Sequence, residues 1–99
     1  MLVTVEYDVA PERASDFIKA MQRYGRIRRR DGAYEWGIFR DTEVANRYLE
    51  IFLVNSWAEH LRQHERQTQA DRELEGRINS YLAAEPVVRH LTYTRTKET

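Results

Sequence analysis

Apolar and polar residues alternate in several short stretches of the chain. Over residues 2–9, every second residue is valine or tyrosine, which is typical of a half-buried strand. The same kind of pattern predicts strands over residues 33–40, 47–54 and 87–93. The stretch 47–54 has β-forming residues on both faces. We therefore expect it to be a central strand that is covered on both sides.

Other stretches repeat apolar residues at helical spacing. One helix is predicted over residues 11–28, and a second, broken helix over residues 57–66 and 68–83. Ser56 and Glu59 form an S-x-x-E pattern, which is typical of a capping box at a helix start. The second helix therefore begins directly after the third strand.

The resulting order is β-α-β-β-α-β, which predicts an α+β, ferredoxin-like fold with one antiparallel sheet and both helices on one face. Residues 1–94 are expected to form a single domain and residues 95–99 a flexible tail. The other sheet face would then be bare and require a partner. Since 99 residues without cysteine form only a small core, we expect a homodimer, packed as a dimeric α+β barrel.

Charge and hydropathy narrow the class of protein. The formal net charge is zero, with 16 basic and 16 acidic residues, which argues against nucleic-acid binding. "RIRRR" at residues 26–30 could be a basic patch, or its arginines could cap the end of a helix. Apolar runs are too short for a membrane span, and no signal-peptide pattern is present. We therefore predict a soluble, cytoplasmic protein.

A family resemblance rests on the motif "E-x-x-x-x-x-S-W-x-E-H", formed by Glu50, Ser56, Trp57, Glu59 and His60. With the broken second helix, it resembles the antibiotic-biosynthesis-monooxygenase-like dimeric α+β barrels. "RRRDGAYEWGIFRD" and "SWAEHLRQHER" are more closely similar to the soluble C-terminal domain of bacterial major-facilitator transporters of the transmembrane secretion effector type. The resemblance implies a homodimer with a ligand pocket between helices and sheet in each subunit.

Enzymes of this fold include cofactor-independent oxygenases of aromatic polyketides, haem-degrading oxygenases, isomerases and cyclases. Trp57 matches the tryptophan that follows the third strand in the cofactor-independent oxygenases, and Asn55 lies near, but not at, a matching position. The haem degraders carry an asparagine on the first strand, where this chain has Glu6, Tyr7 and Asp8. The resemblance therefore implies that no haem is bound.

Trp57, His60 and His64 recur at helical spacing and form a stripe on one face. The two histidines could be a packed pair, or they could bind a ligand or transfer a proton. A metal site would need a third ligand, and we expect neither a metal nor another cofactor. We expect Trp57 and His60 to face the cavity between helix and sheet, with His64 nearer its mouth and His60 as the base.

Four further residues complete the candidate site. Asn55 and Tyr81 could donate hydrogen bonds to a ligand. Glu50, on the central strand, needs a cationic partner or a polar pocket; Arg40 and Arg89 are candidate partners. Trp36 shares a strand face with Tyr34, and the pair could pack at the dimer interface or line the pocket.

Two functions stay open at this point. The first is a cofactor-independent monooxygenase, isomerase or cyclase that acts on an aromatic or polyketide-like molecule. Its catalytic residues would be His60, Trp57 and Asn55, with His64, Tyr81, Glu50 and Trp36 in contact with the ligand. The second is a non-catalytic ligand-binding or accessory module related to the transporter domain.

Overall fold

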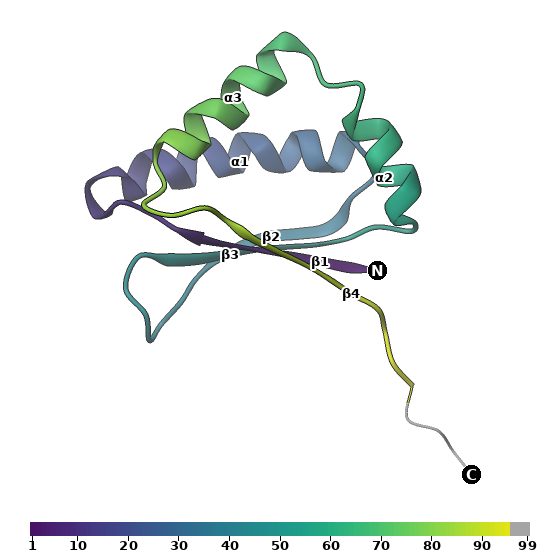
Figure 1. Cartoon of the computed structure of the whole chain (residues 1–99), viewed down its shortest axis with the longest axis horizontal. Coiled ribbons are helices and arrows are strands. Elements are labelled where there is room, and N and C mark those ends of the chain that lie inside the picture. Colours follow the sequence, from purple (N-terminus) through teal and green to yellow (C-terminus); the bar gives the residue numbers. More distant parts are fainter. Residues whose placement is uncertain (96–99) are drawn as a thin grey trace.

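A four-stranded antiparallel sheet forms the base of the molecule (Figure 1). The computed structural model describes residues 1–95, so most of the predicted tail, residues 96–99, lies outside the described part. The strands have the order β2-β3-β1-β4, so β1 and β3 are central, as was expected for β3. Their bounds are β1 Leu2–Asp8, β2 Tyr34–Arg40, β3 Arg47–Leu53 and β4 Val87–Leu91.

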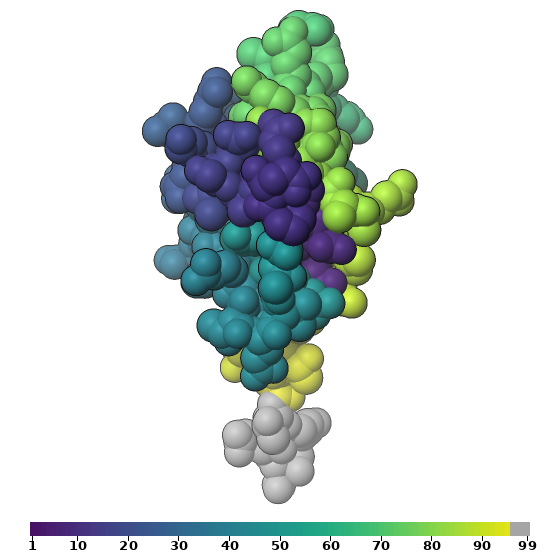
Figure 2. All heavy atoms as spheres, turned by 90° about the vertical axis from the view of Figure 1, so that its left-hand side faces the viewer, coloured from purple at the N-terminus to yellow at the C-terminus, as the bar shows by residue number. Residues whose placement is uncertain are grey.

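Helices cover one face of this sheet (Figure 1). A 3₁₀ turn, η1 Pro11–Arg13, leads into α1 Ala14–Arg30, and the second helix is divided into α2 Trp57–His64 and α3 Gln69–Ser80. The predicted α+β ferredoxin-like fold, with its broken second helix, is confirmed. Seen from the end, α1 and α3 lie side by side above the strands (Figure 2), and the molecule measures only 19 Å in its thinnest direction.

Side-chain caps determine where α2 and α3 begin. Ser56 accepts a hydrogen bond from the backbone N–H of Glu59 at 3.3 Å, but the Glu59 carboxylate turns to Arg62, so only half of the expected capping box forms. A complete capping box joins Thr68 and Asp71 at the start of α3. This second box determines where α3 starts, after the four residues 65–68 that separate it from α2.

The core lies between the sheet and the helices. Alternate residues of β1 and β3 point toward α1, and the Phe17 ring packs 5.2 Å from the rings of both Tyr7 and Tyr48. The opposite face of β3 is only half-buried. The expectation that β3 is covered on both sides is therefore wrong for residues 1–95 of the single chain, which provide one layer of helices.

A bulge changes the direction of the side chains on β2. Tyr34 pairs with Leu53 and the next paired residue is Gly37, while Glu35 between them has a positive φ of 52°. Tyr34 is exposed, but Trp36 turns under α1. Gly25 makes room for it, since a Cβ there would lie 2.9 Å from the indole. Trp36 is thus on the helix-covered face, so of the two roles considered for it, packing at the dimer interface does not apply.

Candidate functional site

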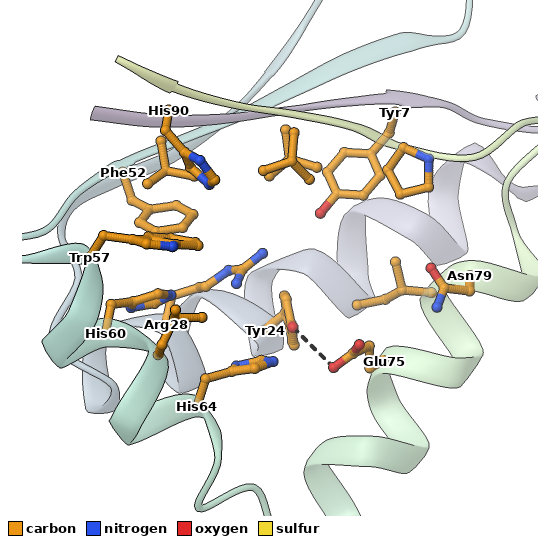
Figure 3. Close-up of a pocket in the computed structure, with 16 residues that line it drawn as sticks. Tyr7, Tyr24, Arg28, Phe52, Trp57, His60, His64, Glu75, Asn79 and His90 are labelled. Carbon is orange, nitrogen blue, oxygen red and sulfur yellow. Dashed lines mark hydrogen bonds between the residues drawn. The ribbon is translucent and has the colours of Figure 1, made fainter. Parts of the chain in front are cut away.

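A cavity of about 320 Å³ lies between the helices and the β1–β4 side of the sheet (Figure 3). Its walls come from β1, α1, β3, α2, α3 and β4. Most of the lining is apolar or aromatic, and a few polar groups converge on the space. This is the usual composition of a small-molecule pocket.

The α2 wall is a stack of aromatic rings. The centroids of Trp57 and His60 are 5.3 Å apart, and those of His60 and His64 are 6.2 Å apart. On the sheet side, the ring of His90 lies 4.0 Å from Trp57. Because α2 begins at Trp57, the spacing of three and then four residues places all three side chains on the cavity face.

The two histidines of this wall differ in burial. His60 is 3% exposed, whereas the side chain of His64 is 31% exposed. Burial lowers the pKa of His60 below its usual range, and the charge of Arg28 lowers it further. His60 is therefore a neutral imidazole at pH 7, and its Nδ1 has no hydrogen-bond partner within residues 1–95.

Arg28 forms the floor of the cavity. Its Nε and Nη2 donate to the two carboxylate oxygens of Glu50 at 2.9 and 3.1 Å. The guanidinium carbon lies 4.6 Å from the ring centre of Tyr24 and 4.7 Å from that of Phe52. A cation that is held in this way keeps N–H groups available for an oxygen of a ligand.

Glu50 is fully buried behind Arg28 and makes four hydrogen bonds. Besides the two from Arg28, it accepts one from the hydroxyl of Tyr7 and one from the indole of Trp36, both at 2.8 Å. Burial alone would lower the pKa of Arg28, but the charge and hydrogen bonds of Glu50 outweigh it and raise that pKa. Arg28 on α1, instead of the expected Arg40 or Arg89, is the partner of Glu50.

A second polar group lies on the α3 side. The hydroxyl of Tyr24 donates to Glu75 Oε2 at 3.3 Å, and Gln67 donates to the same oxygen at 2.6 Å. Burial raises the pKa of Tyr24, so it remains a neutral phenol. Tyr24, Glu75 and Asn79 all line the cavity (Figure 3).

The structure brings together only part of the residue set expected from sequence. Trp57, His60 and His64 line one cavity. Asn55 is exposed before α2, and Tyr81 is buried in the core, where it stacks on Arg13 at 4.5 Å. The structure places Asn55 and Tyr81 away from the lining, so neither is positioned to donate a hydrogen bond to a ligand there.

Glu50 and Trp36 lie one layer behind the lining, where Glu50 holds Arg28 and Trp36 donates a hydrogen bond to Glu50. In the described residues 1–95, no group of three or more His, Cys, Asp or Glu side chains has the geometry of a metal site.

Arg28 and Tyr24 are the main site residues that sequence reasoning missed. Arg28 was grouped with its neighbours in "RIRRR", yet it continues the apolar stripe of Phe17, Met21 and Tyr24 at steps of four, three and four residues. That phase places Arg28 on the buried face of α1. The phase was a usable signal, and it separates Arg28 from the other arginines of the run.

The family model of the transmembrane secretion effectors matches residues 1–98. The chain belongs to this family. Within the part of this transmembrane secretion effector family member that the structure describes, no helix is long and apolar enough to cross a membrane. A comparison with curated proteins gives no match.

Solved structures confirm the expected similarity to antibiotic biosynthesis monooxygenases. One such monooxygenase has a TM-score of 0.80 at 15% identity, covering 96% of this chain and all of that one. A variant of SnoaB, a cofactor-independent oxygenase from Streptomyces nogalater, has a TM-score of 0.72 at 14% identity. The match covers 97% of this chain and 96% of the SnoaB chain. A Mycobacterium tuberculosis protein has a TM-score of 0.77 at 10% identity, and the match covers 98% of this chain and 97% of that one. At these identities, the likeness establishes the fold.

The low pKa of His60 predicts a pH-dependent stability. The unfolded chain binds a proton on this residue below about pH 6.5, whereas the folded chain resists doing so. The stabilisation is therefore complete above about pH 6.5 and is lost as the pH falls below it. When the free energy of unfolding is measured in urea between about pH 7 and about pH 5, its decline with falling pH should be smaller in His60→Leu than in the wild type. An unchanged slope in His60→Leu would contradict the prediction.

Proposed function

We propose that this protein binds a planar aromatic, polyketide-like small molecule in the cavity behind α2. The observation that supports this most directly is the Trp57–His60–His64 stack, which lines a largely apolar cavity together with Arg28. A flat ring would pack against the indole and imidazoles, while its carbonyl or phenolic oxygen would accept a hydrogen bond from Arg28. The volume of about 320 Å³ is at the small end of ligand pockets.

We further propose cofactor-independent oxygenation as the reaction. A suitable substrate is an anthrone, whose CH₂ group loses a proton to give a delocalised enolate. The enolate carbon adds O₂ and the resulting peroxide takes up the proton to give a hydroperoxide. Loss of the second C–H proton and cleavage of the O–O bond then leave a carbonyl, and the other oxygen departs as water. An imidazole of α2 would accept the proton, and Arg28 would stabilise the enolate oxygen. The fold shared with SnoaB supports this proposal.

Oxygen uptake tests the reaction directly. Purified protein is mixed with an anthrone in air-saturated buffer without flavin or metal, and both O₂ consumption and anthraquinone formation are followed. The uncatalysed oxidation is subtracted, and Arg28→Met provides an inactive control. Formation of one anthraquinone for each O₂ consumed, at a rate above background, supports the proposal. An oxygen-uptake rate equal to background excludes it for this substrate class.

A second candidate is a ligand-binding module without catalysis. The family match over residues 1–98 favours it, since that family is defined by secretion effectors and not by an enzymatic reaction. The discriminating result is binding without turnover. A stable anthraquinone would then bind in the cavity with a measurable Kd, while the anthrone would show no oxygen uptake above background.

We also propose that the uncovered sheet face pairs two copies of the chain. Phe39 on this face is 54% exposed, and Leu91 and Val87 at the β4 edge are also exposed. Sedimentation at micromolar concentration should give about twice the chain mass of 11.9 kDa. Phe39→Arg should shift the protein toward monomer, whereas Val44→Arg in the exposed β2–β3 loop should not. A monomeric wild-type protein would contradict the proposal.

A further inference from the structure

Asp31 is a buried carboxylate with one unused oxygen. It is 2% exposed, at the turn that ends α1. Its Oδ1 accepts from Arg30 at 3.1 Å, but its Oδ2 has no hydrogen-bond partner within residues 1–95. The turn itself depends on Gly32, whose φ of +99° favours glycine. Asp31 is thus held firmly in place by the backbone around it.

This position is unfavourable for a carboxylate on stability grounds alone. The C-terminal end of a helix carries partial negative charge, so an acidic group there is repelled. A buried oxygen without a partner also loses its hydration without compensation. A buried, unsatisfied group in a native protein calls for an explanation, and a ligand site nearby provides one.

The nearest group that could satisfy Asp31 is His64. Its Nδ1 lies 3.7 Å from Asp31 Oδ2, and this nitrogen also lacks a hydrogen-bond partner in the described chain. The distance is too long for a hydrogen bond, but the terminal torsion of histidine is broad, so a small ring rotation would close it. The His64 ring projects from α2 into the cavity (Figure 3), which leaves Nε2 for a ligand.

We propose that Asp31 and His64 form a dyad in which Asp31 positions His64 as the proton acceptor of the site. Asp31 Oδ2 accepts the Nδ1–H of His64, which fixes the tautomer with a free lone pair on Nε2. When Nε2 takes a proton from a carbon acid of the ligand, the imidazolium is stabilised by the carboxylate. The proton is then returned from Nε2 to the reduced oxygen that leaves as water.

The charged neighbours favour His64 over His60 for this role. His60 is buried beside the cation of Arg28, and both factors disfavour its protonated form. His64, on α2, faces the carboxylate of Asp31 at the end of α1. On one side of it lies His60, with the two ring centroids 6.2 Å apart. Across the cavity it faces Glu75 and Tyr24. His60 then remains a ligand contact, and the proton passes through His64.

The dyad has a spectroscopic signature that needs no ligand. In ¹⁵N-labelled protein above about pH 8, long-range ¹H–¹⁵N correlation spectra distinguish an Nδ1–H from an Nε2–H imidazole. We expect His64 to be Nδ1–H in the wild type and to lose this preference in Asp31→Ala. Asp71→Ala is the matched control, because Asp71 is also buried and paired with Arg30 but does not face His64. An Nε2–H His64 in the wild type would overturn the dyad.

The catalytic part of this inference rests on the proposed function and is tested separately. With an anthrone, His64→Ala should reduce oxygen uptake about 100-fold, as loss of a general base usually does, and Asp31→Ala should reduce it about tenfold or more. His60→Ala should mainly raise KM. Full activity of His64→Ala would refute its role as base. If the wild type consumes no oxygen, the oxygenase proposal fails, while the tautomer result still decides whether the dyad exists.

Discussion

Glu50→Gln is expected to lower the free energy of unfolding by about 3 kcal/mol, the lower end of the cost of breaking a buried ion pair. The loss is large because Glu50 is fully buried and is the acceptor for Arg28, Tyr7 and Trp36. An uncharged amide would leave the guanidinium without its counter-charge. It would also direct an NH₂ group at groups that are themselves donors. We choose the lower end because Arg28 retains 13% exposure.

Urea unfolding measures this cost, and two variants separate its causes. Glu6→Gln on neighbouring β1 changes a half-exposed carboxylate 3.9 Å from Arg47, so it should cost less than about 1 kcal/mol. The double variant Arg28→Met with Glu50→Leu removes both charges and should recover part of the loss. Equal effects of Glu50→Gln and Glu6→Gln would show that the buried network does not stabilise the fold.

The same network shows why the fold was easier to predict than the site. Alternation in β1 and β3, and the stripe on α1, follow from local periodicity, so the strand and helix order could be predicted from the chain. The helix ends differ from the prediction: α1 extends to Arg30 rather than residue 28, and α3 ends at Ser80 rather than residue 83. Ends depend on caps and turns that periodicity does not encode.

The cavity itself depends on contacts between distant segments. The stripe of Trp57, His60 and His64 was visible from its spacing, because a single helix determines it. The partner of Glu50 could not be predicted from spacing. A bulge at Glu35 and the phase of α1 together bring Trp36 and Arg28 to it. The candidate partners Arg40 and Arg89 lie on other strands, whereas the helix above the sheet provides the cation. Long-range pairing of this kind is decided by packing.

Arg30, on the outer side of the site, also has ion-pair partners that its place in the sequence does not indicate. From sequence it belonged to a run of basic residues, but the structure pairs it with Asp31 and with Asp71 at 2.8 Å on α3. It thus links the end of α1 to the start of α3, and holds the carboxylate that faces His64. Zero net charge had already argued against a nucleic-acid patch, and the two ion pairs give this arginine a structural role instead.

Trp57→Ala is expected to weaken binding of a stable probe, 1,8-dihydroxyanthraquinone, by about threefold to tenfold, as loss of one edge-to-face aromatic contact commonly costs about 0.5–1.5 kcal/mol. The indole is the largest aromatic side chain of the cavity wall. It stacks on His60 and is tilted by 45° against His90, so a ligand meets its edge. Its removal leaves the ligand face in contact with water and releases both imidazoles from their packing. The Kd is measured by equilibrium titration of the probe's absorbance.

Controls on the same helix show whether the effect belongs to the cavity. Arg62→Ala removes an exposed side chain of α2 that pairs with Glu59, so the Kd should change less than about twofold. Trp57→Phe keeps a flat ring and should recover most of the affinity. Folding of each variant is checked by urea unfolding. If Trp57→Ala and Arg62→Ala bind equally well, the ligand does not contact Trp57, and the pocket behind α2 is not its binding site.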